Sequence, residues 1–486
     1  MKFADCLKAL AFFRQERTGN PEINDLVIDS RLVKPGTLFF CIKGHHVDGH
    51  LFAAQAEKNG AVAMIAQDPV DVSIPVIYVN DTHKALAMIS DQFYGHPSRD
   101  LHMIGVTGTN GKTTITYLIQ SIQEAAGMNT GLIGTMGIRY KDEWLPVENT
   151  TPEVHLIHKN LAKMKAQGAV SVVMETSSNA LYDGRVHGCD FNVGIFTNLT
   201  EDHLDLHGTM KDYMYAKSLL FSQLGNSYGS GKKVAVLNAD DPASEVYRHM
   251  TAAQVMTYGI DKGADFRAKS IQIRPAGTDF ILETGSRSYS VSMKLIGKFS
   301  VYNVLAALAA CSIQGLDLAG MIHAVERIKG VSGRFEPVDA GQDFTVIVDY
   351  SHTPDSLENA LDTIREFAQK RIIAVVGCGG DRERGKRPIM ARIAVNKSDL
   401  AVLTSDNPRT EDPAAILEEM EAGIQGSTYK KIINRRDAIK YAVESAESGD
   451  IILIAGKGHE DYQIIGTTKY HFDDREEARA AILERE

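Results

Sequence analysis

The sequence has few of the features that mark membrane, disulfide-rich or nucleic-acid-binding proteins. Its five cysteines are odd in number and lack metal-ligand spacing, which argues against a disulfide framework. No apolar run approaches the roughly 18–20 residues of a membrane helix, so no membrane insertion is expected. The net charge of −10 argues against nucleic acid as a general partner. These absences predict a reduced, cytoplasmic protein.

Low-complexity tracts and internal repeats are also absent, and 44% of the 486 residues are apolar. A chain of this length suggests three domains. A turn-rich stretch at 95–100 forms a first break, and a new strand–helix pattern begins near Glu336. We therefore expect domains at 1–97, 98–335 and 336–486.

The apolar runs predict an α/β fold in all three domains, beginning with a small mixed α/β N-terminal domain. Near-continuous apolar strands separated by helices indicate parallel sheets covered on both faces. This pattern predicts a central P-loop ATPase-like parallel sheet domain and a smaller, doubly wound, Rossmann-like C-terminal domain. The predicted strands are 26–28, 37–42 and 76–79, then 103–107, 170–174, 193–197 and 234–237, then 345–348, 372–376, 400–403 and 451–454.

The strongest local motif is a glycine-rich turn between a strand and a helix. Its backbone N–H groups and the helix N-terminus favour phosphate, Lys112 can reach the β and γ phosphates, and the Thr113 hydroxyl can hold Mg²⁺. The motif is a variant, because Val106 occupies the place of the usual first glycine and Gly108 lies closer to the lysine. The residues expected to bind ATP are Gly108, Thr109, Asn110, Gly111, Lys112, Thr113 and Thr114.

The string Gly-Thr-Asn-Gly-Lys-Thr at 108–113 resembles the ATP loop of the Mur ligases. Further segments match that family in order: 29–31, 149–152, 174–178, 198–205, 216–217, 238–241, 333–336, 349–355, 379–382, 406–409 and 456–460. The resemblance covers essentially the whole chain and is strongest to the members that add a third residue to UDP-MurNAc-L-Ala-D-Glu. It implies uridine-binding, ATP-binding and amino-acid-binding domains in that order.

The resemblance also implies a reaction, its metal ions and their ligands. ATP would convert a carboxylate to an acyl phosphate, which an amine then attacks. Thr113 and Glu175 resemble ligands of one Mg²⁺ and His203 a ligand of a second, while Lys217 resembles the family's carbamylated lysine. A carbamate requires a neutral amine, hence a pKa lowered by burial or by nearby positive charge. The expected catalytic residues are Lys112, Lys217, Glu175 and His203, with Asn303 and Arg334 as further ATP contacts.

The residue to be added is predicted from Asp406-Asn407-Pro408-Arg409, which follows a predicted strand. A guanidinium forms a planar fork for a carboxylate and repels a lysine ammonium. Meso-diaminopimelate has such a carboxylate at its far end, so Arg409 favours it over L-lysine, and the resemblance agrees. L-Lysine is the alternative amino acid. Arg382, Gly456 and Glu460 match the rest of the family's pocket.

The UDP-MurNAc-dipeptide contacts are implied by the same resemblance. Ser30 and the loop 44–47 correspond to the uridine-diphosphate pocket, and Arg185 to an anion clamp. The remaining substrate contacts are expected at Asn149, Thr150, Thr151 and Ser177. The chain departs from the family at Asn179, where His is usual, and at Asp183, where Gln is common, so the local hydrogen bonding there is open.

Other functions remain open alternatives at this point. A P-loop ATPase or kinase would need no third-domain anion pocket, and a silent nucleotide-sugar binder would tolerate loss of Lys112, Glu175 or Lys217. A folate polyglutamate synthase shares the loop chemistry but fits the segments 29–31 and 406–409 poorly. We also expect a monomer with hinges near 97–100 and 335–340 that closes on its ligands.

Overall fold

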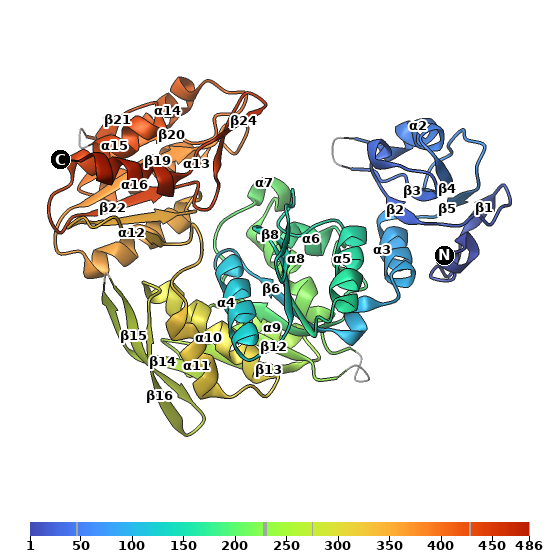
Figure 1. Ribbon diagram of the computed structural model, residues 1–486, viewed down its shortest axis with the longest axis horizontal. Helices are drawn as coiled ribbons and strands as arrows, with labels where there is room; N and C mark the ends of the chain where they lie inside the picture. The colour runs from blue at the N-terminus through green and yellow to red at the C-terminus, as the bar shows by residue number, and fades with distance from the viewer. Residues whose placement is uncertain (45–46, 227–230, 275, 427–428, 486) are drawn as a thin grey trace.

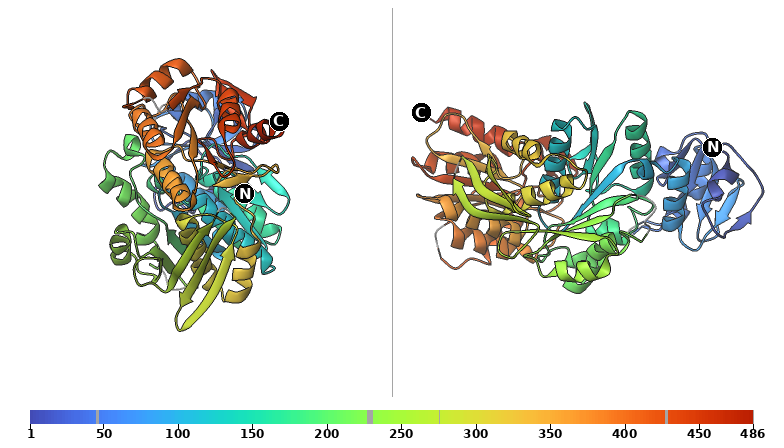
Figure 2. Two further views of the ribbon diagram at one scale, coloured as in Figure 1. Left: turned by 90° about the vertical axis from the view of Figure 1, so that its left-hand side faces the viewer. Right: turned by 90° about the horizontal axis from the view of Figure 1, so that it is seen from below.

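The structure is a computed structural model that describes residues 1–44, 47–226, 231–274, 276–426 and 429–485. It contains an N-terminal, a central and a C-terminal α/β domain, each built on its own sheet, as the sequence predicts (Figure 1). Figure 2 shows the three sheets following one another along the long axis of the molecule. The limits of the domains at 97 and 335 stay predictions. None of the helices in the described ranges is long and apolar enough to cross a membrane.

The N-terminal sheet has the order β1-β5-β4-β3-β2 and is parallel except for β1. Alternation along β3 directs Leu38 and Phe40 toward α3 and Phe39 toward α2, so both faces are covered. The strands are β1 (Arg14–Glu16), β2 (Asp25–Val27), β3 (Thr37–Phe40), β4 (Ala61–Ala66) and β5 (Val76–Tyr78). The helices are α1 (Phe3–Leu7), η1 (Ser30–Leu32), η2 (Gly49–Phe52), α2 (Ala53–Lys58), α3 (Thr82–Phe93) and η3 (Pro97–Asp100).

The central sheet has eleven strands in the order β16-β15-β14-β13-β12-β11-β6-β10-β7-β8-β9. Its predicted strands correspond to β6 (His102–Thr107), β10 (Ser171–Glu175), β11 (Phe191–Phe196) and β12 (Val234–Asn238). The sequence analysis missed the other seven. The edge strands β8, β9, β15 and β16 pair antiparallel, and β16 alternates between exposed and buried positions, unlike the continuous apolar runs that predict buried parallel strands. The missed strands are β7 (Thr130–Gly134), β8 (Gly137–Tyr140), β9 (Glu143–Leu145), β13 (Gln254–Gly259), β14 (Phe266–Arg274), β15 (Gly277–Thr284) and β16 (Arg287–Met293).

Two helices on one face of the central sheet, α4 and α10, lie next to the nucleotide loop. The apolar stripe of α4, from Ile115 to Ile122, is buried against the sheet. Helix α10 is buried nearly all round because it lies between α4, α11 and the strands. The central helices are α4 (Lys112–Ala125), α5 (Val154–Ala166), α6 (Ser178–Tyr182), α7 (Leu204–His207), α8 (Met210–Ser222), α9 (Ala243–Met250), α10 (Lys298–Ser312) and α11 (Leu318–Arg327).

The C-terminal sheet has the order β17-β18-β22-β19-β20-β21 and is parallel except for β17. This is the predicted doubly wound arrangement, in which ligands bind outside the carboxyl ends of the strands. The strands are β17 (Glu336–Val338), β18 (Thr345–Asp349), β19 (Ile372–Cys378), β20 (Leu400–Ser405), β21 (Tyr429–Lys431) and β22 (Ile451–Ala455), with a separate hairpin of β23 (Tyr462–Ile465) and β24 (Thr468–His471). The helices are α12 (Pro354–Phe367), α13 (Lys386–Lys397), α14 (Pro413–Glu421), α15 (Arg435–Ser445) and α16 (Asp474–Glu484).

The central and C-terminal domains touch at the nucleotide loop. Asp355, in the first turn of α12, accepts hydrogen bonds from Asn110 Nδ2 at 2.8 Å and from Thr200 Oγ1 at 2.9 Å. The chain crosses between these domains through Gly333 and Phe335, whose φ angles are 63° and 49°. A Cβ on Gly333 would lie 1.9 Å from the backbone nitrogen of His459, so only glycine fits there.

Candidate active site

The nucleotide loop runs from the end of β6 to the start of α4 and leaves room for phosphate. Gly108 and Gly111 have φ angles of 148° and 90°. A Cβ on Gly108 would lie 1.7 Å from Thr197 Oγ1, and one on Gly111 would lie 2.5 Å from Asn303 Oδ1. Glycine at these positions therefore lets the backbone curl toward the helix N-terminus, where phosphate is favoured. Asn303, predicted as an ATP contact, lies directly beside this loop.

Two lysine ammonium groups converge on one carbonyl of that loop. The Nζ atoms of Lys112 and Lys217 each donate to the Gly108 carbonyl oxygen at 2.9 Å, and Lys112 also donates to the Thr109 carbonyl at 2.8 Å. Burial lowers the pKa of Lys217 well below its usual value, and the nearby charge of Lys112 lowers it further. Burial also lowers the pKa of Lys112. The lowered pKa of Lys217 is a shift in the direction that a carbamate requires.

Glu175 ends β10 next to the nucleotide loop and is buried. Its Oε2 accepts from Thr113 Oγ1 at 3.0 Å and from Thr135 Oγ1 at 3.1 Å, while Oε1 accepts from the Thr135 N–H at 2.9 Å. Arg334, from the crossing segment, donates to Thr113 Oγ1 at 3.1 Å. A carboxylate and a hydroxyl at this spacing form an oxygen donor pair of the kind Mg²⁺ prefers. The residues present therefore fit a magnesium ion beside the phosphates.

His203 lies on the same side of the central domain, at the start of the short helix α7. Its backbone is left-handed, with φ of 55°, and its side chain is half-exposed. Its ring centroid lies 6.0 Å from that of Tyr213, the aromatic residue under the Lys217 ammonium. Burial of the ring lowers the pKa of His203 although Asp202 raises it. A neutral imidazole is the form that can bind a metal ion.

The predicted dipeptide contacts surround the end of β10. Thr151 Oγ1 donates to the Glu175 carbonyl at 2.8 Å and accepts from the Ser177 N–H at 3.0 Å. Thr150 accepts from Thr135 at 3.1 Å, whereas Asn149 is exposed. The guanidinium of Arg185 is already paired with two carboxylates, Asp183 at 3.0 Å and Glu153 at 3.3 Å. Asp183, a departure from the family pattern, thus holds the expected anion clamp.

In the C-terminal domain, two arginines lie on either side of a glycine turn after β19. A Cβ on Gly379 would stand 3.0 Å from Arg409 Nη1 and 3.8 Å from Arg382 Cγ. Arg409 Nη1 donates to the Gly380 carbonyl at 2.8 Å, while Arg382 is exposed. The structure therefore brings Arg409, the predicted carboxylate-binding residue, and Arg382, predicted for the same pocket, to one edge of the sheet.

A polar cluster beside them contains the other predicted pocket residues. Asn407 Nδ2 donates to Glu460 Oε2 at 2.8 Å, and the buried Lys457 Nζ lies 3.1 Å from Asn407 Oδ1 and 3.3 Å from Glu460 Oε2. A Cβ on Gly456, where φ is 122°, would lie 2.5 Å from Asp406 Oδ2. Burial raises the pKa of Glu460, with Asp406 adding to the effect and Lys457 opposing it. The carboxylates of this cluster can bind the ammonium group of a ligand, and the neighbouring arginines can bind a carboxylate of the same ligand.

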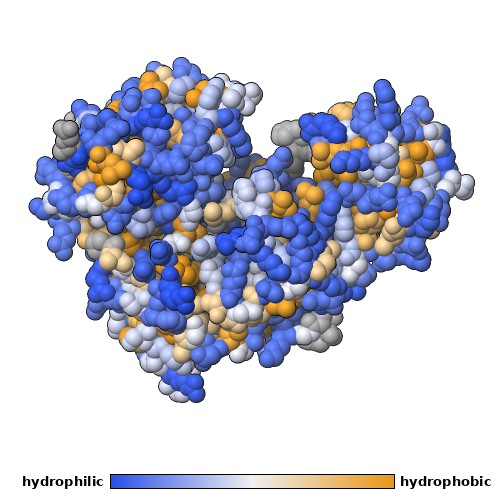
Figure 3. All heavy atoms as spheres, viewed as in Figure 1, coloured by the Kyte–Doolittle hydropathy of each residue, from blue (hydrophilic) through white to orange (hydrophobic). Residues whose placement is uncertain are grey.

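A hollow of about 460 Å³ lies between these loops and the central domain. Asp205 of α7 lines one side, and Arg382, Arg384 and Glu411 line the other. Figure 3 shows the surface hollowed above the central domain, between the two outer domains. The hollow therefore borders Arg382, one of the residues predicted for the amino-acid pocket.

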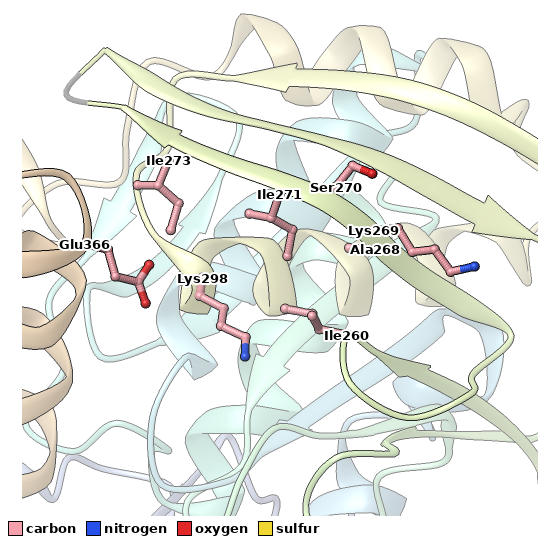
Figure 4. A pocket seen from close by; sticks show the side chains of 8 residues that line it. All are labelled: Ile260, Ala268, Lys269, Ser270, Ile271, Ile273, Lys298 and Glu366. Carbon is pink, nitrogen blue, oxygen red and sulfur yellow. The ribbon is translucent and has the colours of Figure 1, made fainter.

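A second cavity, of about 520 Å³, lies away from the predicted site residues (Figure 4). Apolar side chains along β14, including Ile271 and Ile273, line it together with Lys298 at the start of α10 and Glu366 on α12. None of the predicted substrate or metal residues borders it. The cavity marks the contact of the β14–β16 extension with the C-terminal domain.

The predicted uridine site lies in the N-terminal domain, apart from the phosphate loop. Ser30 is buried at the start of η1, where the Asp29 side chain caps the Arg31 N–H at 2.9 Å. Of the loop expected to complete this pocket, residues 45–46 lie outside the described residues.

Sequence reasoning missed several residues that hold the site together. Tyr213 lies four residues before Lys217 on α8, places its ring centroid 4.1 Å from the Lys217 Nζ and contacts Thr109 Oγ1 through its hydroxyl at 3.2 Å. The i, i+4 spacing of an aromatic residue and a lysine could have indicated this pair. Asp355 and Lys457 lie within segments that resemble the Mur ligases, but only the folded chain shows which loops each of them connects.

Comparison with known proteins places these features in a family. The model of the Mur ligase middle domain matches residues 106–311, that of the Mur ligase glutamate ligase domain 333–458, and that of the Mur ligase family catalytic domain 22–94. The UDP-N-acetylmuramoyl-L-alanyl-D-glutamate--2,6-diaminopimelate ligase of Geobacillus thermodenitrificans is 53% identical over 488 residues, with 100% of both chains covered. The protein of the same name from Listeria innocua is 54% identical over 484 residues, with 99% of both covered.

A solved structure bearing that ligase name is also similar to the present fold. It has a TM-score of 0.71 and 34% sequence identity, and the match covers 99% of each chain. Since sequence and fold agree from one end of the chain to the other, the chain belongs to the Mur ligase family.

Proposed function

We propose that this chain is an ATP-dependent ligase that adds meso-diaminopimelate to UDP-MurNAc-L-Ala-D-Glu, giving the UDP-MurNAc-tripeptide of peptidoglycan synthesis with release of ADP and phosphate. The observation that carries the proposal is the pairing of two distinct sites in one chain. A phosphate loop with two converging lysines, of which Lys217 is buried, faces a C-terminal pocket that combines arginines with carboxylates. The names of the relatives agree with this assignment.

The first half of the reaction activates the acceptor. A carboxylate oxygen of the dipeptide attacks the γ-phosphorus of ATP, and the bond to the β-phosphate oxygen breaks to release ADP. The Lys112 ammonium donates to the carbonyls of Gly108 and Thr109. Its positive charge in the phosphate loop offsets the charge that develops on the phosphates. Arg334 and Asn303 flank the same loop and bind the nucleotide.

The metal site belongs to this half. Magnesium supplies charge neutralisation and a fixed geometry for the phosphate oxygens. Thr113 and Glu175 would hold one ion, and His203 with a carbamylated Lys217 a second. The burial of the Lys217 amine, its hydrogen bond to the Gly108 carbonyl and its lowered pKa support the carbamate.

The second half joins the amino acid. The amine attacks the acyl carbon, a tetrahedral intermediate forms, and phosphate leaves with the carboxylate oxygen that had bonded to phosphorus. Arg409 and Arg382 bind the distal carboxylate of diaminopimelate, while Glu460, held by Asn407, accepts the distal ammonium. L-Lysine has no distal carboxylate for the arginines. The site is complete in one chain, so we expect a monomer acting in the cytoplasm, where nucleotide substrates are made.

The test is incubation of the purified protein with ATP, Mg²⁺, UDP-MurNAc-L-Ala-D-Glu and a panel of amino acids, followed by mass analysis of the uridine product. The proposal expects a single product heavier by diaminopimelate less water, with one ADP for each product. ADP formation without a heavier uridine conjugate would instead support a simple ATPase. Equal rates with L-lysine would overturn the assigned amino acid.

A further inference from the structure

The amino-acid pocket is supported from behind by Arg387, the second residue of α13, whose side chain has no exposed surface. Its Nη2 donates to the Gly379 carbonyl at 3.2 Å and to Glu411 Oε1 at 2.8 Å. Its Nη1 donates to Glu411 Oε2 at 3.0 Å and to Glu419 Oε2 at 2.8 Å. One guanidinium therefore joins three segments of the C-terminal domain.

Two of those segments are the loops that carry Arg382 and Arg409, both predicted for the amino-acid pocket. Gly379 precedes Arg382, and Glu411 follows Arg409 by two residues. Glu411 Oε1 also accepts from the Asp381 N–H at 2.5 Å, so each loop is bound to Arg387 or to its partner Glu411. Arg387 itself does not line the hollow.

The loops also bond directly to one another, so Arg387 is not their only link. Gly380 N–H donates to the Asn407 carbonyl at 2.9 Å, and the Thr410 hydroxyl donates to Asp381 Oδ1 at 2.8 Å. Loss of Arg387 should therefore loosen the loops without unfolding them. The Nε of Arg387 is buried without a partner among the described residues. Such an incompletely satisfied buried charge is weak evidence for stability and favours a role in fixing geometry.

We propose that Arg387 is a positioning residue for the incoming amino acid. Resting on the proposed ligase function, it holds the Gly379–Arg382 and Asp406–Glu411 segments at the spacing that lets Arg382 and Arg409 grip one carboxylate together. A planar, bidentate fork can bridge Glu411 and the Gly379 carbonyl at once, whereas a lysine ammonium is a point charge that cannot reproduce both contacts. Displacement of a binding group by about 1 Å can cost as much as 10²-fold in rate.

The same helix provides a control in Arg392, an exposed arginine that does not line the hollow. A role in general charge balance would affect both arginines alike, whereas a positioning role belongs to Arg387.

The experiment compares the wild type with Arg387→Lys, Glu411→Gln and Arg392→Gln, measuring kcat and the KM of each of the three substrates. We expect Arg387→Lys and Glu411→Gln to raise the KM for diaminopimelate about tenfold or more, with the KM values for ATP and UDP-MurNAc-dipeptide within about twofold of wild type. Arg392→Gln should stay within about twofold for all three.

Calorimetric titration with diaminopimelate alone provides a readout that needs no turnover, and thermal unfolding shows that each variant is folded. A folded Arg387→Lys with unchanged diaminopimelate affinity would overturn the proposal, as would equal rises in all three KM values. If the wild type binds diaminopimelate but forms no product, the ligase assignment fails while the affinity comparison still tests Arg387. If the wild type binds no diaminopimelate, both are overturned.

Discussion

Two buried cations, one in the central domain and one in the C-terminal domain, are held in opposite ways. Lys217 donates to a single carbonyl, that of Gly108, lies over the Tyr213 ring and has no carboxylate among its contacts in the described chain. Arg387 pairs with two carboxylates and a carbonyl. The first setting lowers the pKa of Lys217, and the second raises the pKa of Arg387 through its hydrogen bonds to Glu411.

The difference follows from what each residue can do. A lysine can lose its proton when it is buried, whereas an arginine stays charged and offers a rigid fork of donors. In our proposal the central domain therefore has Lys217, a cation that can lose its proton, beside the loop expected to bind phosphate. The C-terminal domain places the permanent cation where binding needs a fixed geometry. Substitutions that give one position the side-chain property of the other, a permanent charge at 217 or a flexible point charge at 387, should therefore impair the corresponding function.

The largest effect is expected for Lys217→Arg. This variant keeps a positive charge but cannot form a carbamate, so it should lose about 10²–10³-fold in kcat, and Lys217→Ala should lose a similar amount. Steady-state product formation measures the loss. The exposed Lys211, on the same helix, provides the control, because Lys211→Ala should retain wild-type activity. An active Lys217→Arg enzyme would show that the charge of this residue, and not its carbamylation, matters.

A smaller and more selective effect is expected for Arg409→Ala. Loss of a charge-assisted contact of roughly 1.5–3 kcal/mol should raise the KM for diaminopimelate about tenfold to over a hundredfold, while the KM for ATP changes little. Kinetics with each substrate varied in turn tests this. Arg392→Ala, at an exposed position of α13, is the matched control. A parallel rise in the KM for ATP would place Arg409 in the nucleotide site instead.

The Arg387 cluster should also make stability depend on pH. Hydrogen bonds from Arg387 and then from the Asp381 N–H lower the pKa of Glu411 to about 2, against an ordinary value of 4.5. The folded state favours the ionised form, so the stabilisation is present above the ordinary pKa and is lost as the pH falls from 4.5 toward 2.

Thermal unfolding midpoints of wild type and Glu411→Gln should therefore differ most near neutral pH and converge on acidification. The corresponding difference in unfolding free energy is about 1–3 kcal/mol. A difference in unfolding midpoint between the two proteins that stays constant as the pH falls to about 2 would contradict this coupling between Glu411 and its hydrogen-bond donors.

The smallest effect is expected for an ion pair at the surface of the same domain. Lys397 pairs with Glu358 at 2.8 Å and Asp362 at 2.7 Å, joining α13 to α12. Because water and salt screen such pairs, Lys397→Ala should lower the unfolding free energy by less than about 1 kcal/mol. Denaturant unfolding at low and high salt measures it, with the exposed Lys430→Ala as reference. A loss as large as that of Glu411→Gln would remove the distinction between buried and exposed cations.

Much of the fold could be predicted because buried parallel strands leave continuous apolar runs. Strands β6, β10, β11 and β12 and the four predicted C-terminal strands were found this way. The β14–β16 extension was missed because hairpin strands with one solvent-exposed face alternate between polar and apolar residues. Their pairing also depends on distant chain segments. The local sequence pattern therefore predicts the central strands of a sheet more readily than its edge strands.

The site divides in a similar way. Lys112, Thr113 and Arg409 could be predicted as site residues because each stands in a short motif whose spacing carries the chemistry. The contacts of Arg387, and that of the Tyr213 hydroxyl with Thr109, could not be predicted because they join segments that the sequence does not place together. The pairing of Arg185 with Asp183 was likewise visible only in the folded chain.

The central claim is that ATP activates a carboxylate that an amine then captures. Isotope transfer tests this directly, using UDP-MurNAc-L-Ala-D-Glu labelled with ¹⁸O in the carboxylates of its glutamate. If an acyl phosphate forms, one labelled oxygen leaves with each phosphate when diaminopimelate attacks, and mass analysis of the released phosphate should show it. Phosphate that carries no label, formed alongside the heavier uridine product, would contradict the account.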